Sequence, residues 1–100
     1  MVVFVNRLVL TGSAAELEQR YAKVADFMRA QDGIIRYRLL RSRKDPSVYF
    51  NVAEWTDQER FDRALKDPRF RSLLAPVLEV VTGEPYVTDV VLAGEAVQVG

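Results

Sequence analysis

Hydrophobic and polar positions change their spacing along this chain, and each change marks a predicted element. Residues 2–11 are mostly Val, Leu and Phe, which predicts a largely buried first strand. Ser13 and Glu16 then stand at the spacing at which a hydroxyl and a carboxylate cap each other's free backbone N–H groups, so a helix is expected to begin there. Gly33 is expected to end this helix. Its apolar stripe consists of Leu17, Tyr21, Val24 and Met28, with Phe27 beside it.

Two alternating segments joined by a turn come next. Residues 33–42 and 48–55 are predicted to be strands, and Lys44-Asp45-Pro46-Ser47 between them has the composition of a hairpin turn. In the earlier strand, Ile35, Tyr37 and Leu39 are expected on one side, and Ile34, Arg36, Arg38 and Leu40 on the other. In the later strand, Tyr49, Asn51, Ala53 and Trp55 share one side, opposite Val48, Phe50 and Val52.

The second half of the chain is predicted to be helical and then extended. Thr56-Asp57-Gln58-Glu59 repeats the capping spacing, and Asp67-Pro68 interrupts or restarts the helix because proline lacks the N–H group. Thr82-Gly83-Glu84-Pro85 is expected to be a turn, residues 86–92 the fourth strand, and residues 93–100 a tail with at most a short edge strand. The second helical stripe consists of Phe70, Leu73, Leu74, Val77 and Val81, with Pro76 at a bend.

The order β-α-β-β-α-β predicts an α+β fold, the ferredoxin-like split plait. Both helices then lie on one face of a four-stranded antiparallel sheet, and residues 1–100 form a single domain with its core in 2–92. Both sides of the strand at 48–55 are apolar, so the face without helices also requires cover. We therefore expect a homodimer that forms through this bare face.

Composition narrows the classes of function. The 14 basic and 14 acidic side chains cancel, and the largest basic cluster is Arg41-Ser42-Arg43-Lys44, so we expect neither nucleic acid nor a membrane surface as partner. The chain contains no Cys and no His, which excludes a disulfide framework, a thiol nucleophile, a His base and the usual nitrogen and sulfur metal ligands. The apolar opening is interrupted at Asn6-Arg7, so it is not read as a signal peptide or membrane span, and a cytoplasmic location is expected.

Asn51 and Trp55 are the first candidate site residues. They are four residues apart on one side of a strand, so they are roughly 13 Å apart along the same face and, with Tyr49, are placed to line a cleft between sheet and helices. A buried amide without a partner costs about 1–3 kcal/mol, so Asn51 must bond to protein, water or a ligand. The alternative is structural: an edge asparagine bonded to a neighbouring loop, and a tryptophan that fills the core.

Asn6 raises the same question in the first strand, because it stands between Phe4 and Leu8 on its own face. Two amides on apolar strands favour a ligand cavity, although Asn6 near the end of the sheet is also compatible with an outward orientation. Arg36 and Arg38 are interpreted as a solvated or dimer-rim face. Asp57 and Glu59 are interpreted as helix caps and not as general acid–base groups.

The pattern AQDGIIRYRLLRSRKDPSVYFNVAEWTDQERFDRALKDPRF, together with the split plait, resembles the antibiotic biosynthesis monooxygenase domain family, small proteins that form a dimeric α/β barrel. The resemblance covers residues 2–92. Its most specific parts are Asp32-Gly33, Asp45-Pro46, and Glu54-Trp55 followed by an acidic helix start and Phe61.

The resemblance implies a cofactor-free monooxygenase of polycyclic aromatic or quinone-type polyketides. In such enzymes of the family an Asn stands four residues before a Trp, so Asn51 would bond a carbonyl or peroxide oxygen and Trp55 would pack on the aromatic substrate. Where those enzymes have a tyrosine hydroxyl early in the second helix, this sequence has Phe61, and Tyr37, Tyr49 or Tyr86 would have to reach the same cavity to replace that hydroxyl. Phe70 and Leu74 are core residues that would also be pocket walls.

Other activities occur in this family. A branch that degrades haem has an Asn-Arg-Leu similar to Asn6-Arg7-Leu8, but it requires an axial His, and this chain reads Arg71-Ser72-Leu73-Leu74 in that region. Haem degradation is therefore not expected. We also expect no cofactor and no bound metal. A polyketide cyclase or isomerase, or a non-catalytic ligand-binding dimerisation module, remains open alongside the oxygenase.

Overall fold

A computed structural model of the chain describes residues 1–98 and confirms the split plait. Its elements are β1 (Val2–Leu10), α1 (Ala14–Met28), β2 (Ile34–Arg41), β3 (Val48–Trp55), α2 (Gln58–Lys66), α3 (Pro68–Leu78) and β4 (Val81–Asp89). The sheet has four strands in the order β2-β3-β1-β4, and all neighbouring strands are antiparallel. The apolar opening segment is thus one of the two inner strands.

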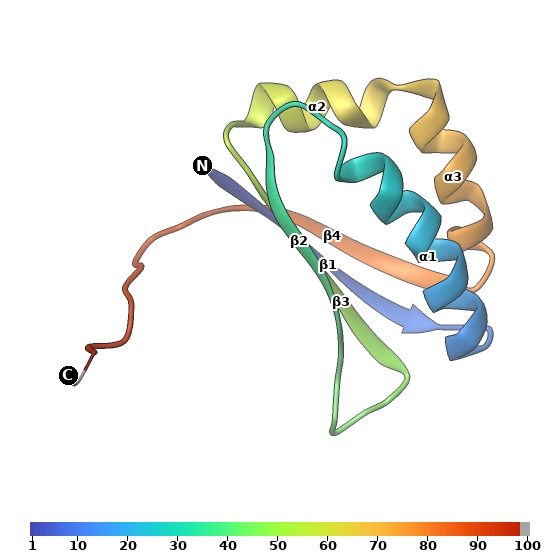
Figure 1. The fold of residues 1–100 in the computed structure, drawn as a ribbon. Coiled ribbons are helices and arrows are strands. Elements are labelled where there is room, and N and C mark those ends of the chain that lie inside the picture. Colours follow the sequence, from blue (N-terminus) through green and yellow to red (C-terminus); the bar gives the residue numbers. More distant parts are fainter. Residues whose placement is uncertain (99–100) are drawn as a thin grey trace.

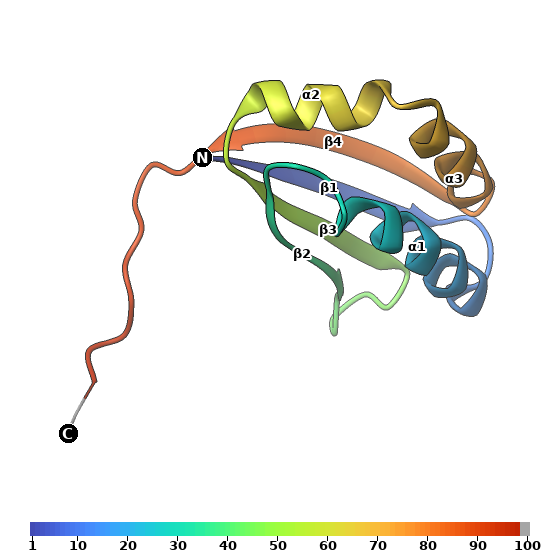
Figure 2. The same cartoon turned by 45° about the horizontal axis from the view of Figure 1, so that its top comes forward.

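The three helices cover one face of this sheet and leave the other face bare (Figure 1). Turning the molecule shows α2 and α3 along the β1–β4 side and α1 toward β3 and β2 (Figure 2). Among residues 1–98, no helix combines the length and the apolar composition that crossing a bilayer requires. The layered arrangement leaves the space between helices and sheet as the place for a core or a pocket.

The start of α1 agrees with the sequence, whereas its end differs. Ser13 caps the helix by accepting a hydrogen bond from the backbone N–H of Glu16 at 3.1 Å, but the Glu16 carboxylate binds Arg20 and does not return to Ser13. The helix ends at Met28, so the prediction that Gly33 ends it is wrong. Gly33 directly precedes β2 and has φ 93°. A Cβ at this residue would lie 2.5 Å from Cδ of Arg60, so the position requires glycine.

The second helical region contains two helices that share one residue. Asp67 ends α2 and caps α3, where its side chain accepts from the N–H of Arg69 at 2.9 Å, and Pro68 occupies the first turn. Asp57, and not Thr56, caps α2 by accepting from the N–H of Arg60 at 2.9 Å. The capping spacing that begins at Thr56 therefore located this helix but placed its cap one residue too early, whereas the interpretation of Asp57 as a helix cap is confirmed.

The fourth strand begins five residues earlier than predicted. Val81, assigned to the helical stripe, is the first residue of β4, and the expected turn at residues 82–85 lies within the strand. Gly83 and Pro85 are tolerated because β4 is an edge strand that pairs only with β1. The strand ends at Asp89, and residues 93–98 form no strand; residues 99 and 100 lie outside the described part of the chain.

A register shift in β2 corrects a second prediction. Ile34 pairs with Trp55, but Arg36 pairs with Glu54, so the bulge between them places Ile34 on the helix-facing side. Ile35 is 49% exposed instead. Tyr37 and Leu39 face the helices, as the alternation predicts.

The core is divided into two clusters with different composition. The larger one includes residues of α1 and of the end of α3. It consists of Leu8, Leu17, Tyr21, Val24, Tyr49, Val77, Val80 and Val81. The smaller one, at the start of α2, consists of Ala53, Trp55, Phe61 and Ala64. Met28 packs against both clusters. A cavity lies between the two clusters, and residues of both clusters line it.

Candidate functional site

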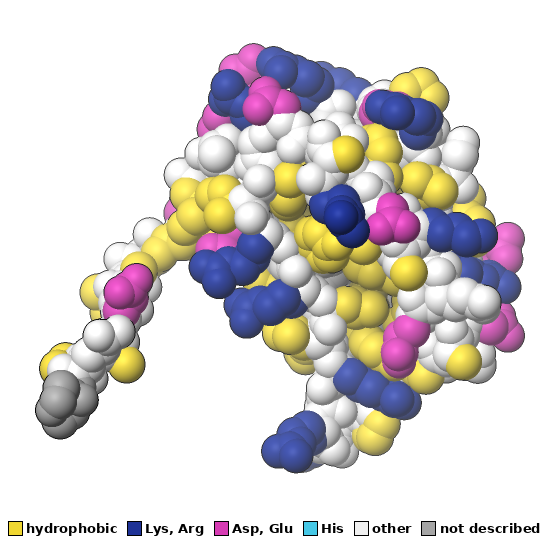
Figure 3. Space-filling model, in the orientation of Figure 1, with side chains coloured by type: hydrophobic (Ala, Val, Ile, Leu, Met, Phe, Trp, Pro, Cys, Tyr) yellow, Lys and Arg dark blue, Asp and Glu magenta, His cyan; other side chains and the backbone are white. Residues whose placement is uncertain are grey.

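A cavity of about 350 Å³ lies between the sheet and the helices. Seen from the side drawn in Figure 3, hydrophobic side chains gather in the middle of the molecule, and charged side chains surround them. The sheet forms the floor of this cavity. Ala53, Gly83 and Pro85 are small residues of the sheet that leave space above it. The volume lies within the range of roughly 300–1,000 Å³ that small-molecule sites occupy.

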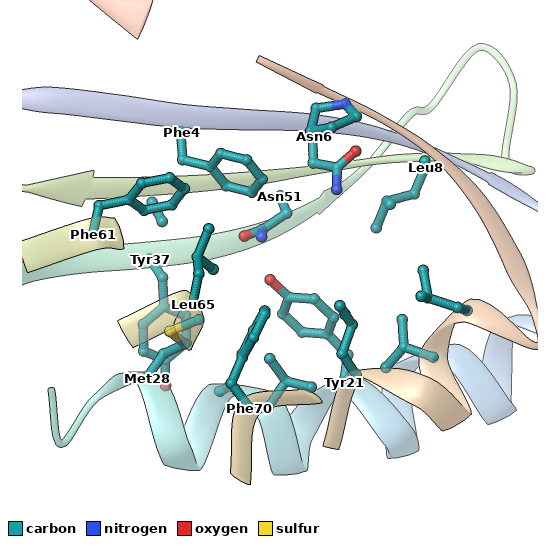
Figure 4. A pocket seen from close by; sticks show the side chains of 18 of the residues that line it. Phe4, Asn6, Leu8, Tyr21, Met28, Tyr37, Asn51, Phe61, Leu65 and Phe70 are labelled. Atoms are coloured by element: carbon teal, nitrogen blue, oxygen red, sulfur yellow. The ribbon is translucent and has the colours of Figure 1, made fainter. Parts of the chain in front are cut away.

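Two amides lie at the centre of the cavity floor. Asn6 of β1 pairs directly with Asn51 of β3, and both side chains point toward the helices (Figure 4). The Oδ1 atoms of both residues are buried and lack a hydrogen-bond partner. Because β3 is an inner strand, the interpretation of Asn51 as an edge residue bonded to a loop is wrong. Each amide can present its N–H₂ or its oxygen to a ligand after a half-turn rotation.

Aromatic side chains form one end of the cavity. Trp55 is 1% exposed and contacts Phe61 edge to face, with ring centroids 5.6 Å apart. Phe61 in turn packs on Phe4, with centroids 5.1 Å apart. The Nε1 atom of Trp55 is buried and unpaired, so the tryptophan fills the core and also leaves an N–H donor without a partner. Such a donor costs about 1–3 kcal/mol unless a ligand or water accepts from it.

The remaining walls come from β2, the helices and the edge strand β4. Tyr37, Phe70 and Leu74, three of the residues proposed from sequence, line the cavity together with Asn6, Asn51, Trp55 and Phe61. The other lining residues are Phe4, Leu8, Tyr21, Val24, Ala25, Met28, Ala53, Leu65, Val77, Leu78, Gly83 and Pro85. The polar groups among all these residues are neutral amides, phenols and an indole.

Tyr49 is the one proposed site residue that does not line the cavity. Its side chain is 2% exposed in the larger core cluster, and its hydroxyl donates to Glu18 Oε2 at 2.5 Å. Burial, followed by the hydrogen bond to Glu18, raises the pKa of Tyr49. The hydroxyl of Tyr86, another possible donor, bonds Glu84 on an exposed part of β4.

Tyr21 and Gly83 are two of the cavity residues that were not proposed from the sequence. Tyr21 was assigned only to the apolar stripe of its helix, although a tyrosine in a core usually has a partner for its hydroxyl, and that was the available signal. Gly83 was read as part of a turn. A Cβ at residue 83 would lie 3.1 Å from Oδ1 of Asn6, so the glycine leaves room for this amide.

Charged residues near the site have structural roles. Arg60 binds both Asp32, at 3.0 Å, and Asp57, and so ties the start of α2 to the loop before β2. The hydrogen bond from the backbone N–H of Arg60 is the main reason that the pKa of Asp57 is lowered. Arg36 pairs with Glu54 at 2.5 Å on the bare face. Within residues 1–98, no group of three or more Asp or Glu side chains is arranged to hold a metal ion.

The fold and the cavity define a class of protein: a ferredoxin-like domain with a partly open apolar pocket and neutral hydrogen-bonding groups at its centre. The sequence profile of the antibiotic biosynthesis monooxygenase family matches residues 1–75. The chain belongs to this family, as its sequence pattern had suggested.

Individual relatives agree with this assignment. The chain is 45% identical over 69 residues to the deoxynogalonate monooxygenase of Streptomyces nogalater, a match that covers 69% of this chain and 58% of that protein. It superposes with a TM-score of 0.89 on SnoaB, a cofactor-independent oxygenase from Streptomyces nogalater, at 36% identity over 92% of this chain and 94% of the other. A protein of Methanosarcina mazei shares the fold at 14% identity, with a TM-score of 0.78 over 87% and 90% of the two chains.

Proposed function

We propose that this protein is a cofactor-independent monooxygenase that oxidises a polycyclic aromatic, polyketide-type metabolite with O₂. The observation that carries the proposal is the pocket itself: an apolar cavity in which two amide oxygens at the centre and an indole N–H at the aromatic end lack partners within the protein. The similarity to SnoaB, a cofactor-independent oxygenase, over 92% of the chain supports the same activity. The family membership sets the reaction class that we propose.

The proposed reaction uses the electrons of the substrate. An aromatic ketone with an acidic C–H bond loses a proton to water, and the resulting carbanion transfers one electron to O₂. The two radicals join in a C–O bond, and the peroxide is protonated. Loss of the second C–H proton then breaks the O–O bond, so the carbon becomes a carbonyl and the second oxygen atom leaves as water. The protein contributes an apolar pocket, orientation and hydrogen bonds to the developing oxyanion.

The cavity residues receive roles that follow from their positions. Asn51 donates to the carbonyl or peroxide oxygen from the middle of the sheet, and Asn6 beside it provides a second amide. Trp55 and Phe61 pack on the aromatic rings of the substrate. Tyr37, Phe70 and Leu74 close the walls. The neutral lining suits an anionic substrate, because neutral donors stabilise its charge without a competing ion pair.

The proposed activity is tested by oxygen consumption. Metal-stripped protein is mixed with a panel of anthrones and hydroquinones in a closed cell with an oxygen electrode. We expect uptake of one O₂ per quinone formed, at a rate proportional to the concentration of protein. Rearrangement of a substrate without uptake of O₂ would contradict the oxygenase and favour a cyclase or isomerase. Binding without any change in the substrate would favour a ligand-binding module.

We also propose that the protein forms a homodimer through the bare face of the sheet. Apolar side chains on this face have no cover within one chain, and the segment after β4 extends away from the body with Val91 and Leu92 96% and 92% exposed (Figure 1). A second copy covers the same surface on both partners by two-fold symmetry. The strand register places Val3, Val5, Val9, Leu40, Val48, Phe50, Val52 and Tyr86 on this face, and of these Val48 is already buried within one chain.

The dimer is tested by replacing Val52 with lysine. Val52 lies in the middle of the bare face, paired with Val5, so the variant would bury an unpaired ammonium group in the interface at a cost of several kcal/mol. Sedimentation equilibrium should give about twice 11.4 kDa for the unmodified protein and a monomer for Val52→Lys. Gln19→Lys, on the exposed side of α1, is the control and should remain dimeric. A monomeric unmodified protein would contradict the proposal.

We further propose that residues 1–100 form a single domain with its core in 2–92, and that the protein works in the cytoplasm with a small aromatic molecule and O₂. Neither a nucleic acid nor a membrane is part of this proposal. The balanced charge of the chain, 14 basic and 14 acidic side chains, supports this choice of partners.

A further inference from the structure

Tyr21 is a further polar group of the cavity, in addition to the two amides and the indole. It comes from α1, opposite the sheet, and its side chain is 8% exposed. Figure 4 shows its hydroxyl directed into the cavity toward Asn51. No described residue forms a hydrogen bond with this hydroxyl, so its donor capacity is available to a bound molecule.

The other tyrosines do not offer the same group. The hydroxyls of Tyr49 and Tyr86 are bonded to Glu18 and Glu84, outside the cavity. Tyr37 lines the wall, but Figure 4 shows its ring directed along Met28, away from the two amides. Tyr21 is thus the phenol that faces the centre of the site.

The surroundings of Tyr21 keep its hydroxyl protonated. Burial is the main reason that the pKa of Tyr21 is raised well above its ordinary value, and the nearby Tyr37 adds to this effect. A phenol with a raised pKa is neutral at every pH near 7, so it donates a hydrogen bond and does not act as a base. The same apolar surroundings strengthen a hydrogen bond between this donor and an anion.

We propose that Tyr21 is a catalytic residue that donates a hydrogen bond to the oxyanion of the bound substrate, from the side opposite Asn51. This role rests on the proposed oxygenase function. The substrate oxygen lies between an amide on the sheet and a phenol on α1, and its carbanion form is stabilised by both. Tyr21 keeps its proton throughout, while the proton of the substrate C–H bond goes to water. The phenol of α1 takes the place of the hydroxyl that Phe61 lacks.

The positions of the two donors indicate which group of the substrate they bind. Two donors that reach one point from different elements suit a single carbonyl-type oxygen, which accepts along two diverging lone-pair directions in the plane of a fused aromatic system. The rings then extend toward Trp55 and Phe61, at the aromatic end of the cavity. We infer that the substrate is a flat aromatic ketone whose enolate oxygen is held between the donors.

The test measures the acidity of a bound ligand without turnover. Anthrone is titrated with pH in the absence of O₂, and the visible absorption of its enolate reports its ionisation. We expect the protein to lower the pKa of bound anthrone, and Tyr21→Phe to raise this bound pKa by about one unit, which corresponds to about 1.4 kcal/mol. In the presence of O₂, the same variant should oxidise anthrone about tenfold more slowly.

Tyr49→Phe is the matched control. It also removes a hydroxyl from a buried tyrosine, but this hydroxyl bonds Glu18 outside the cavity, so the bound pKa should be unchanged. Tyr21→Phe keeps the ring, and its melting temperature shows whether the fold is intact. If the Tyr21→Phe variant lowers the pKa of bound anthrone and consumes O₂ as well as the unmodified protein does, only the role of Tyr21 is contradicted, and the proposed function stands. A protein that neither lowers the pKa of anthrone nor consumes O₂ with it or the wider panel contradicts the proposed function as well.

Discussion

Asn51→Ala is expected to lower the rate of oxygen uptake by about 10²-fold to 10³-fold, the loss typical of removing one donor to a developing oxyanion. The amide lies at the middle of the cavity floor, where its Oδ1 atom has no partner in the protein. Its loss therefore removes a contact with the reacting molecule and breaks no bond within the fold. The turnover number, measured with saturating anthrone in an oxygen electrode, reports this loss.

The stability of the same variant separates a site residue from a structural one. Because a buried amide without a partner is unfavourable, the free energy of unfolding of Asn51→Ala should equal or exceed that of the unmodified protein. Urea denaturation measures this quantity. Gln19→Ala is the control, because it removes an exposed amide from α1 and should change neither property. A clear loss of stability with full activity would contradict the role proposed for Asn51.

Trp55→Ala is expected to destabilise the protein by about 3–5 kcal/mol, because it leaves a large cavity at a residue that is 1% exposed. For a chain of this size, each kcal/mol shifts the melting temperature by about 4–8 °C, so the variant should melt at least about 12 °C lower. Thermal denaturation followed by circular dichroism measures the shift. This prediction tests the contribution of Trp55 to the smaller core cluster.

Trp55→Phe tests the second contribution of the same residue. Phenylalanine keeps an aromatic ring against Phe61 but removes the Nε1–H group, which is unpaired in the protein. We expect a much smaller change in melting temperature than with alanine, together with about tenfold slower oxygen uptake from the loss of one hydrogen bond, about 1.4 kcal/mol. Full activity of Trp55→Phe would show that the tryptophan acts only as part of the core.

The sequence predicted the fold well where one periodicity dominated. Strict alternation in residues 48–55 placed Asn51, Ala53 and Trp55 on the same side of β3, as the structure confirms. The start of α1 was also clear, because Ser13 has the residue type and the position of a helix cap. These features are local, and local features can be recognised from neighbouring residues alone.

Features that depend on the rest of the sheet were predicted less well. Gly83 and Pro85 have turn composition, and only the edge position of β4 explains why they lie within a strand. The bulge between Ile34 and Arg36 reverses the side on which Ile34 lies, and alternation does not reveal it. In both cases the pairing with a distant strand determines the outcome.

The site shows the same division between local and distant information. Alternation places Tyr49 on the face of Asn51 but not at the same position along the sheet, so Tyr49 contacts Glu18 of α1 instead of the cavity. Tyr21 has a helical spacing typical of a core residue, and only the packing of α1 over the two amides gives its hydroxyl a place in the site. Which helix covers which part of the sheet cannot be read from spacing.

In the proposed reaction, this pocket inserts one atom of O₂ into an aromatic substrate without a cofactor. The most direct measurement is mass spectrometry of the quinone formed from anthrone by metal-stripped protein under ¹⁸O₂. We expect one ¹⁸O atom in the new carbonyl, the other in water, and a rate of label incorporation that falls with Asn51→Ala. An unlabelled product, or labelling no faster than in a sample without protein, would contradict it.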